Sequence, residues 1–406
     1  MQSQTYGNNT KWLKIVWFIL VELILLTGVF YAGIKFNASR QQSTASPQII
    51  FPTSKLAYNS KDKAKIYNFQ DGKEIDLGLS GVTTFLWSKN GQLAALVQGK
   101  YGGDQGFLKT PRVFASTEGF NYLLYLVDLD GKKPKLIIPE VSGEVSWSED
   151  STGFYVSENY YKGRPILLGE QSGLQPDEIK TFFITLNGIK KPINKDVFDK
   201  AVMQVSGRTS PNNKFYIKSG DMAGFEKITE IGNGKEYTLK PGGYYVRTFG
   251  AKWSSDGERI AFLYKVSDEA TRNEILNITT FNEVLTQNFS DKLKGSLPSA
   301  ESVDFDWAGS QLIIVSQLNY IAQPGYYQGN IGIYDVDSDK FRVLVPSITQ
   351  QVPYSNTLLV SPDRKFFTYQ TSKNLEEEEI IVADIEGKEI KGLSGSGPSW
   401  EPIVAK

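Results

Sequence analysis

Short apolar segments alternate with polar turns along most of the chain, a pattern typical of β-strands joined by hairpins. In the most regular signature, an apolar segment ends in Trp-Ser and is followed by a polar turn and a second apolar segment. The key positions of its seven copies are Trp87, Trp147, Thr209, Trp253, Trp307, Val360 and Trp400. The first and last of them lie 313 residues apart, so one repeat averages about 52 residues.

A second signature, a hairpin tip that follows an alternating strand, lies between successive copies of the first. Asn-Gly and Asp-Gly between apolar runs are strong hairpin signals. The seven tips are Asp71-Gly72, Asp130-Gly131, Asn187-Gly188, Asn233-Gly234, Asn282-Glu283, Ser338-Asp339 and Glu386-Gly387. Each unit should therefore hold four strands, and a four-stranded unit of this length repeated in series predicts the blade of a β-propeller.

The two ends of the repeat region complement each other. The first unit begins with only three strands, near Lys55–Tyr58, Lys65–Phe69 and Glu74–Leu77, while Ser399–Val404 forms a strand without a blade of its own. Joining them would complete a blade and remove exposed sheet edges. The sequence thus predicts an all-β, seven-bladed propeller over residues 51–406, closed by the C-terminal strand. A six-bladed or open arrangement is the alternative.

The repeats resemble a known family. Trp253-Ser254-Ser255-Asp256-Gly257 and the hairpin Asp128–Lys132 are similar to the WD40-like (PD40) repeats of the TolB propeller family, which also occur in prolyl oligopeptidases and dipeptidyl peptidases. TolB has an α/β domain before its propeller, for which the tether here leaves no room. The peptidases have a hydrolase domain with a catalytic His, and this chain has no His and no G-x-S-x-G. The resemblance implies the fold and leaves the function open.

A different pattern precedes the repeats. Ile15–Ile34 is an apolar run with one charge, long enough to span the ~30 Å core of a bilayer as a helix. We therefore predict a tail at 1–11, a transmembrane signal-anchor helix at 12–36 and a flexible tether at 37–50. A cleaved signal peptide is the alternative, although its apolar region would be shorter. We expect a single-pass protein of the cell membrane, with the propeller on the extracytoplasmic side.

Glu22 is the one acidic residue of the predicted helix. An acid inside a membrane is a candidate for contact with a partner, here another membrane subunit. The alternative is a single tolerated acid that is protonated or reaches towards the interface.

Composition excludes several classes of function. Lys and Arg number 44 and Asp and Glu 45, so the chain lacks the basic excess that nucleic-acid binding requires. It has no Cys and no His, which excludes zinc sites of the usual kind and mechanisms that depend on a catalytic His. Asp335–Asp339 imitates a calcium loop, but Lys340 replaces the required Gly. We expect no cofactor, no metal and no nucleic-acid partner.

Long connections are predicted on one face of the propeller, between the second and third strands of several blades. Long loops on a rigid scaffold commonly carry binding residues, and tyrosine suits peptide or sugar recognition. These connections are Gly99–Gly119, Asn159–Lys180, Val266–Asn273 and Gln317–Gly329. The candidate binding residues on this face are Tyr101, Phe107, Tyr160, Tyr161, Arg164, Tyr244, Tyr245, Tyr320, Tyr326 and Tyr327. The alternative is that these rings only pack the loops onto the blades.

The leading hypothesis is therefore a non-catalytic binding or scaffold module for a protein or glycan partner in the cell envelope. One alternative is a carbohydrate-active enzyme, a glycosidase or lyase, that uses paired carboxylates in the propeller funnel. Another is a structural subunit that Glu22 recruits to a membrane complex. The Trp positions of the repeat are assigned a structural role.

Overall fold

The computed structural model describes most of the repeat region. The described residues are 54–61, 63–98, 122–130, 133–141, 144–160, 178–205, 208–218, 224–240, 245–266, 274–286, 300, 302–321, 326–350, 358–373 and 377–402.

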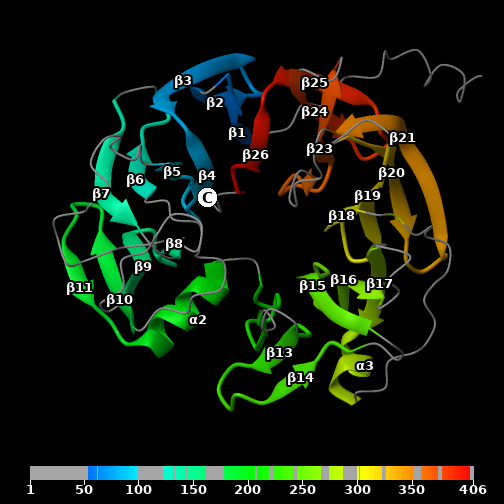
Figure 1. Ribbon diagram of the computed structural model, residues 1–406, viewed down its shortest axis with the longest axis horizontal. Helices are drawn as coiled ribbons and strands as arrows, with labels where there is room; N and C mark the ends of the chain where they lie inside the picture. Colours follow the sequence, from blue (N-terminus) through cyan, green and yellow to red (C-terminus); the bar gives the residue numbers. More distant parts are fainter. Residues whose placement is uncertain are drawn as a thin grey trace, which may run out of the picture. The chain divides into compact units, whose positions relative to one another are not determined.

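The strands form seven antiparallel sheets arranged in a ring, which confirms the prediction of an all-β, seven-bladed propeller (Figure 1). From the inside outwards, blade 1 holds β26 (Ser396–Trp400), β1 (Lys55–Ser60), β2 (Lys63–Asn68) and β3 (Lys73–Ser80). Blade 2 holds β4 (Val82–Trp87), β5 (Leu93–Gln98), β6 (Tyr122–Val127) and β7 (Lys135–Val141). Blade 3 holds β8 (Val145–Trp147), β9 (Gly153–Tyr160), β10 (Glu178–Thr185) and β11 (Lys190–Pro192).

Blades 4 and 5 are three-stranded in the described part of the chain. Blade 4 holds β12 (Phe215–Lys218), β13 (Lys227–Glu230) and β14 (Glu236–Thr238), and blade 5 holds β15 (Tyr245–Trp253), β16 (Arg259–Val266) and β17 (Glu274–Thr280). Blade 6 holds β18 (Ser302–Trp307), β19 (Leu312–Tyr320), β20 (Tyr327–Asp335) and β21 (Lys340–Gln350). Blade 7 holds β22 (Leu359–Val360), β23 (Phe366–Lys373), β24 (Glu377–Asp384) and β25 (Glu389–Ser394).

The C-terminal strand closes the ring. In β26, Trp400 pairs with Leu56 and Ser399 with Ala57 of β1. The Lys55 ammonium also lies 3.2 Å from the Glu401 carboxylate. The strand begins at Ser396 rather than at the expected Ser399, because the Ser396 end of the segment already pairs with Asn59.

One predicted hairpin tip is wrong. Asn282-Glu283 lies in the helix α3 (Phe281–Thr286) and not in a turn between strands. The Glu283 carboxylate accepts a hydrogen bond from the Thr280 amide at 2.8 Å, and the Thr280 hydroxyl accepts one from the Glu283 amide at 3.3 Å. This reciprocal pair is a capping box, which starts a helix where the hairpin was expected.

Five tryptophans of the repeat link neighbouring blades. Each indole Nε1 donates a hydrogen bond to a backbone carbonyl of the preceding blade. The acceptor is always the residue one before that blade's own Trp position in the repeat. The bonds run from Trp87 to Ser399, Trp147 to Leu86, Trp253 to Arg208, Trp307 to Lys252 and Trp400 to Leu359, at 2.8–3.4 Å. The bond of Trp87 joins blade 2 to β26, the C-terminal strand that completes blade 1. Blades 4 and 7 have Thr209 and Val360 at this position, and neither side chain has an indole donor.

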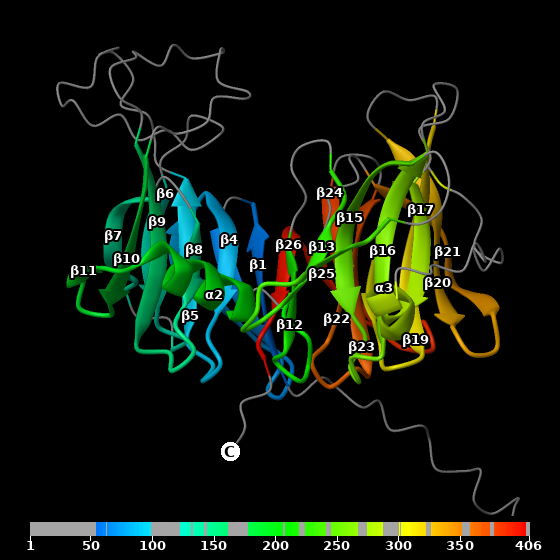
Figure 2. The same ribbon diagram turned by 90° about the horizontal axis from the view of Figure 1, so that it is seen from below.

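Apolar clusters fill the spaces between blades. Six clusters of buried side chains lie at the interfaces 1–2, 2–3, 4–5, 5–6, 6–7 and 7–1. Among the described residues the interface of blades 3 and 4 has no such cluster. There the helix α2 (Lys195–Val205), which the strand repeat did not predict, contacts β8, β9 and β10 on one side and β12 on the other (Figures 1 and 2). Phe198 of α2 is buried, at 4 % exposure.

Candidate functional site

The tyrosine-rich face is described only in part. Tyr320 ends β19 and Tyr327 begins β20, so these two residues are direct partners across the hairpin. Their rings lie 5.6 Å apart, edge to face, and Tyr320 is 47 % exposed. Tyr326 and Tyr327 are half-buried. The structure thus presents one exposed and two half-buried tyrosines at this end of blade 6.

The connection expected over Gln317–Gly329 is shorter than predicted, because the β19–β20 ladder continues to Tyr320 and Tyr327. Gly329 permits this pairing: a Cβ added there would overlap the carbonyl oxygen of Gln317. The strands therefore carry the aromatic pair on paired backbone at the end of the hairpin, beside the exposed Asn319 and Gln328.

The side chains of the other seven candidates are outside the described part of the structure. Tyr101, Phe107, Tyr161, Arg164 and Tyr244 lie outside the described residues, and only the backbone is described for Tyr160 and Tyr245.

Glu22 and the predicted anchor also lie outside the described residues. In the part of the chain that the structure describes, no helix is long and apolar enough to span a bilayer.

Two acids on β18 occupy the space between blades 6 and 7. The carboxylate of Asp304 accepts a hydrogen bond from the Leu358 amide at 3.0 Å, and that of Asp306 accepts one from the Val360 amide at 2.9 Å. Burial raises the pKa of Asp304, opposed mainly by the charge of Lys252, while Asp306 raises it further. These bonds link blades 6 and 7 where blade 7 has Val360 in place of Trp.

Glu226 is a buried acid between blades 4 and 5. It is 3 % exposed, and its carboxylate accepts a hydrogen bond from the Ala251 amide at 2.8 Å. Burial raises its pKa, and the Ala251 amide and the Arg208 guanidinium, 3.8 Å away, oppose the shift. Its oxygens face the backbone of β15, so this acid also links two blades.

The described residues contain no group of three or more acidic side chains able to hold a metal ion. Asp335, in the segment that imitates a calcium loop, accepts hydrogen bonds from the amides of Asp337 and Ser338 at the β20–β21 turn. Hydrogen bonds from the side chain and the amide of Ser338 lower the pKa of Asp335. Asp337 pairs with Arg259 at 2.6 Å.

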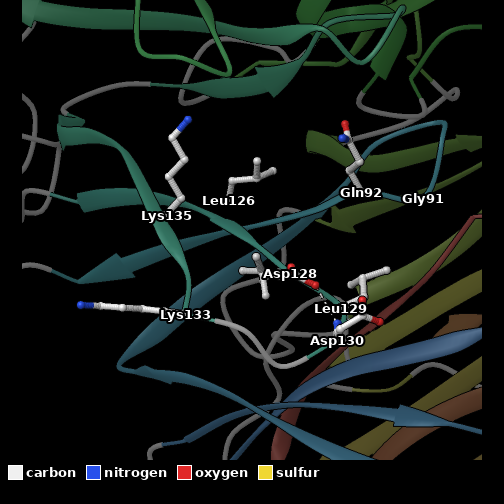
Figure 3. A pocket seen from close by; sticks show the side chains of 9 residues that line it. Gly91, Gln92, Leu126, Asp128, Leu129, Asp130, Lys133 and Lys135 are labelled. Carbon is white, nitrogen blue, oxygen red and sulfur yellow. Dashed lines mark hydrogen bonds between the residues drawn. The ribbon is translucent and has the colours of Figure 1, made fainter.

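A cleft of about 410 Å³ lies at the outer part of blade 2 (Figure 3). Two of its polar groups have partners: Asp128 accepts from the Asp130 amide at 2.9 Å, and Lys135 donates to the Leu186 carbonyl of blade 3 at 2.9 Å. Gln92 also lines the cleft, and its buried Oε1 has no hydrogen-bond partner. Lys133 and Lys135 point away from the two acids in Figure 3.

A second cleft, of about 550 Å³, lies between α2 and blade 4. Asp196 and Asp199 line it from the helix, and Tyr216, Lys218 and Thr229 line it from the sheet. It coincides with the one interface that lacks both an apolar cluster and a tryptophan bond among the described residues. The strand repeat predicts neither this cleft nor the helix that forms one of its walls.

Comparisons with known proteins support the propeller fold and nothing more specific. Neither a protein-family model nor a curated protein matches the sequence. Among solved structures, TolB from Acinetobacter baumannii is similar over 86 % of this chain and 67 % of its own, with 14 % identity and a TM-score of 0.41. The tricorn protease is similar over 86 % of this chain and 34 % of its own, with 13 % identity and a TM-score of 0.44.

A putative 6-phosphogluconolactonase from Bacteroides uniformis is similar over 86 % of this chain and 99 % of its own, with 8 % identity and a TM-score of 0.46. The chain is a seven-bladed propeller with distant structural similarity to the propellers of TolB and the tricorn protease.

Proposed function

We propose that this protein is a single-pass membrane protein whose extracytoplasmic propeller is a non-catalytic binding or scaffold module for a protein or glycan of the cell envelope. The observation that carries the proposal is the aromatic pair at the end of blade 6, where the exposed ring of Tyr320 lies edge to face on the half-buried Tyr327. An exposed tyrosine combines a large apolar area with a polar tip and loses little conformational entropy on binding.

Support for binding comes from the way the pair is held. Tyr320 and Tyr327 sit on directly paired strand residues, and the Ile321 amide donates to the Tyr326 carbonyl at 3.0 Å. A ring held on paired backbone is ordered before a partner arrives, which lowers the cost of association.

The test compares two exposed residues of blade 6. Tyr320 and Val343 are 47 % and 46 % exposed, so Tyr320→Ala and Val343→Ala remove surface side chains of similar accessibility. Partners are captured from crosslinked membranes that contain the full-length protein, and the affinity of the captured partner is then measured for both variants. We expect Tyr320→Ala to weaken binding by about 1–3 kcal/mol and Val343→Ala to leave it unchanged. Equal affinities, or no reproducible partner, would contradict the proposal.

A double variant distinguishes binding from packing at the same hairpin. If Tyr326 and Tyr327 contact a partner, replacing both with Ala should weaken binding while the melting temperature barely moves. If they only pack the hairpin, the melting temperature should fall and the affinity should stay the same.

A carbohydrate-active enzyme is the second candidate, favoured by the raised pKa of Asp304 close to the charge of Asp306. A glycosidase pairs a carboxyl of raised pKa with a second carboxylate. Asp304→Asn should then abolish turnover in a glycan screen. Because the Leu358 amide already occupies this carboxylate, a purely structural Asp304 would instead lower stability without changing any turnover.

The structural-subunit alternative rests on Glu22. Under it, Glu22→Leu should release a membrane partner while the propeller stays folded.

A further inference from the structure

Two joints of the ring lack the tryptophan that bonds a blade to the preceding one, and only one of them is visibly compensated. At the joint between blades 6 and 7, Val360 takes the tryptophan position. Two acids of blade 6 bridge this joint: Asp304 accepts a hydrogen bond from the Leu358 amide at 3.0 Å. Asp306 accepts one from the Val360 amide at 2.9 Å. At the joint between blades 3 and 4 the position is Thr209, which offers a short hydroxyl in place of an indole.

The two faces of blade 4 differ in chemistry. The face towards blade 5 is apolar and joins a buried cluster through Ile217, Ile228 and Tyr237. The opposite face carries a polar row of cross-strand partners, Thr209, Tyr216, Thr229 and Glu236. Paired residues of adjacent strands place their side chains on the same side of a sheet, so this row faces α2. Burial of apolar area is the main source of stability at such contacts, so blade 4 is held less firmly towards α2 than towards blade 5.

The closed joint also carries a cost that its opening would relieve. Thr229 is 4 % exposed, and its Oγ1 has no hydrogen-bond partner in the structure. A buried polar atom without a partner is destabilising, and water would bond this hydroxyl once blade 4 and α2 separate. The cleft of about 550 Å³ between them adds to the cost, because the atoms that line it lose packing contacts.

We propose that the propeller opens reversibly at the joint between blades 3 and 4, and that α2 stays on blade 3 when it does. The helix lies mainly against β8, β9 and β10 of blade 3 and touches β12 of blade 4 (Figure 1). Opening exposes the polar row of blade 4, while the pairing of β26 with β1 keeps the closure of the ring intact. Such an opening is a sub-global movement, because each blade keeps its own strand pairing.

Single cysteines at two joints test the proposal, since the chain has no Cys of its own. Thr229→Cys places a thiol at the joint between blades 3 and 4. Ser316→Cys is the matched control at the joint between blades 6 and 7, because Ser316 lies on β19 between Ile314 and Leu318 of the apolar cluster there. Ser316 is 2 % exposed, and its Oγ also has no hydrogen-bond partner. Neither substitution therefore removes a hydrogen bond, and both keep the side chain near its original size.

The rate of thiol labelling is measured on the full-length protein in detergent, with a dye maleimide in excess and with urea kept below the unfolding transition. We expect Thr229→Cys to react about ten- to hundred-fold faster than Ser316→Cys, the ratio expected for one hydrogen bond between blades. Its rate should also rise with urea, because an opened joint exposes surface that the closed ring buries. If the two variants differ in melting temperature, the rates are compared at urea concentrations that give equal free energies of unfolding.

Two results would overturn the proposal. Equal labelling rates would show that the joint between blades 3 and 4 opens no more readily than the joint between blades 6 and 7. Fast labelling of Thr229→Cys that does not change with urea would show that the reagent enters through the cleft while the ring stays closed.

Discussion

Trp147 offers a direct measurement of how much one indole bond between blades contributes to stability. Its side chain is 1 % exposed, its Nε1 donates to the Leu86 carbonyl at 2.8 Å, and its ring lies 4.2 Å from that of Phe154. Trp147→Phe keeps an aromatic ring against Phe154 but removes the donor and part of the volume. A buried carbonyl left without its partner costs about 1–3 kcal/mol, and the small cavity adds about 1 kcal/mol. We therefore expect a loss of about 2–4 kcal/mol.

Trp400→Phe is the matched control. Trp400 is also buried and also sits at the end of an innermost strand, but its bond to the Leu359 carbonyl is 3.4 Å long and therefore weaker. The same substitution there should cost about 1–2 kcal/mol, mostly from the cavity. Urea unfolding of the full-length protein, followed by circular dichroism, gives both values. If Trp147→Phe costs no more than Trp400→Phe, the indole bonds contribute nothing to stability and the prediction is wrong.

Three further predictions address closure, the hairpin and pH. Deleting Ser396–Lys406 should remove the innermost strand of blade 1 and cause aggregation or loss of cooperative unfolding; an unchanged melt would contradict the closure. Gly329→Ala should separate the end of the β19–β20 hairpin, seen as faster amide hydrogen exchange there, whereas Gly309→Ala, where an added Cβ meets open space, should not. Burial raises the native pKa of Glu226, so its stabilising contribution is present below its unfolded pKa and is lost as pH rises through the native value. Glu226→Gln cannot titrate and should lose less stability than the unaltered protein as the pH rises above the unfolded pKa of glutamate, about 4.3; parallel curves would refute this.

The blades could be predicted from the sequence because their signals are local. The serine of the Trp-Ser turn shows why: Ser254 Oγ accepts the Arg259 amide at 3.0 Å, and the Ser254 amide donates to the Arg259 carbonyl at 2.9 Å. Such a turn satisfies its backbone hydrogen bonds within six residues, and this requires particular residue types. Wherever those residue types recur in the sequence, the turn and the strands that flank it can therefore be predicted.

The cleft could not be predicted because it depends on a helix between two blades. Asn194 starts α2 by accepting the Asp196 amide with its side chain at 3.0 Å. Phe198 and Ala201 are buried, and the helix contacts β8, β9 and β10 of blade 3. A capping Asn194 and buried residues three positions apart, Phe198 and Ala201, are signals of a helix. They lie within a long series of strand signals, however, and that series predicts another strand at this point. Which face of blade 4 meets the helix follows only from the strand register.

The pairing of β26 with β1 has a consequence for synthesis. The Lys55 and Glu401 side chains that meet at the closure are 346 positions apart, and closing such a loop costs on the order of 5 kcal/mol of chain entropy. Blades 2 to 7 each come from consecutive stretches of the chain and can form as they leave the ribosome. Blade 1 must wait for roughly 300 more residues, on the order of 15–60 s at ordinary translation rates. During that interval the nascent chain carries the unpaired edge of β1, to which a strand of another chain can add until translation ends.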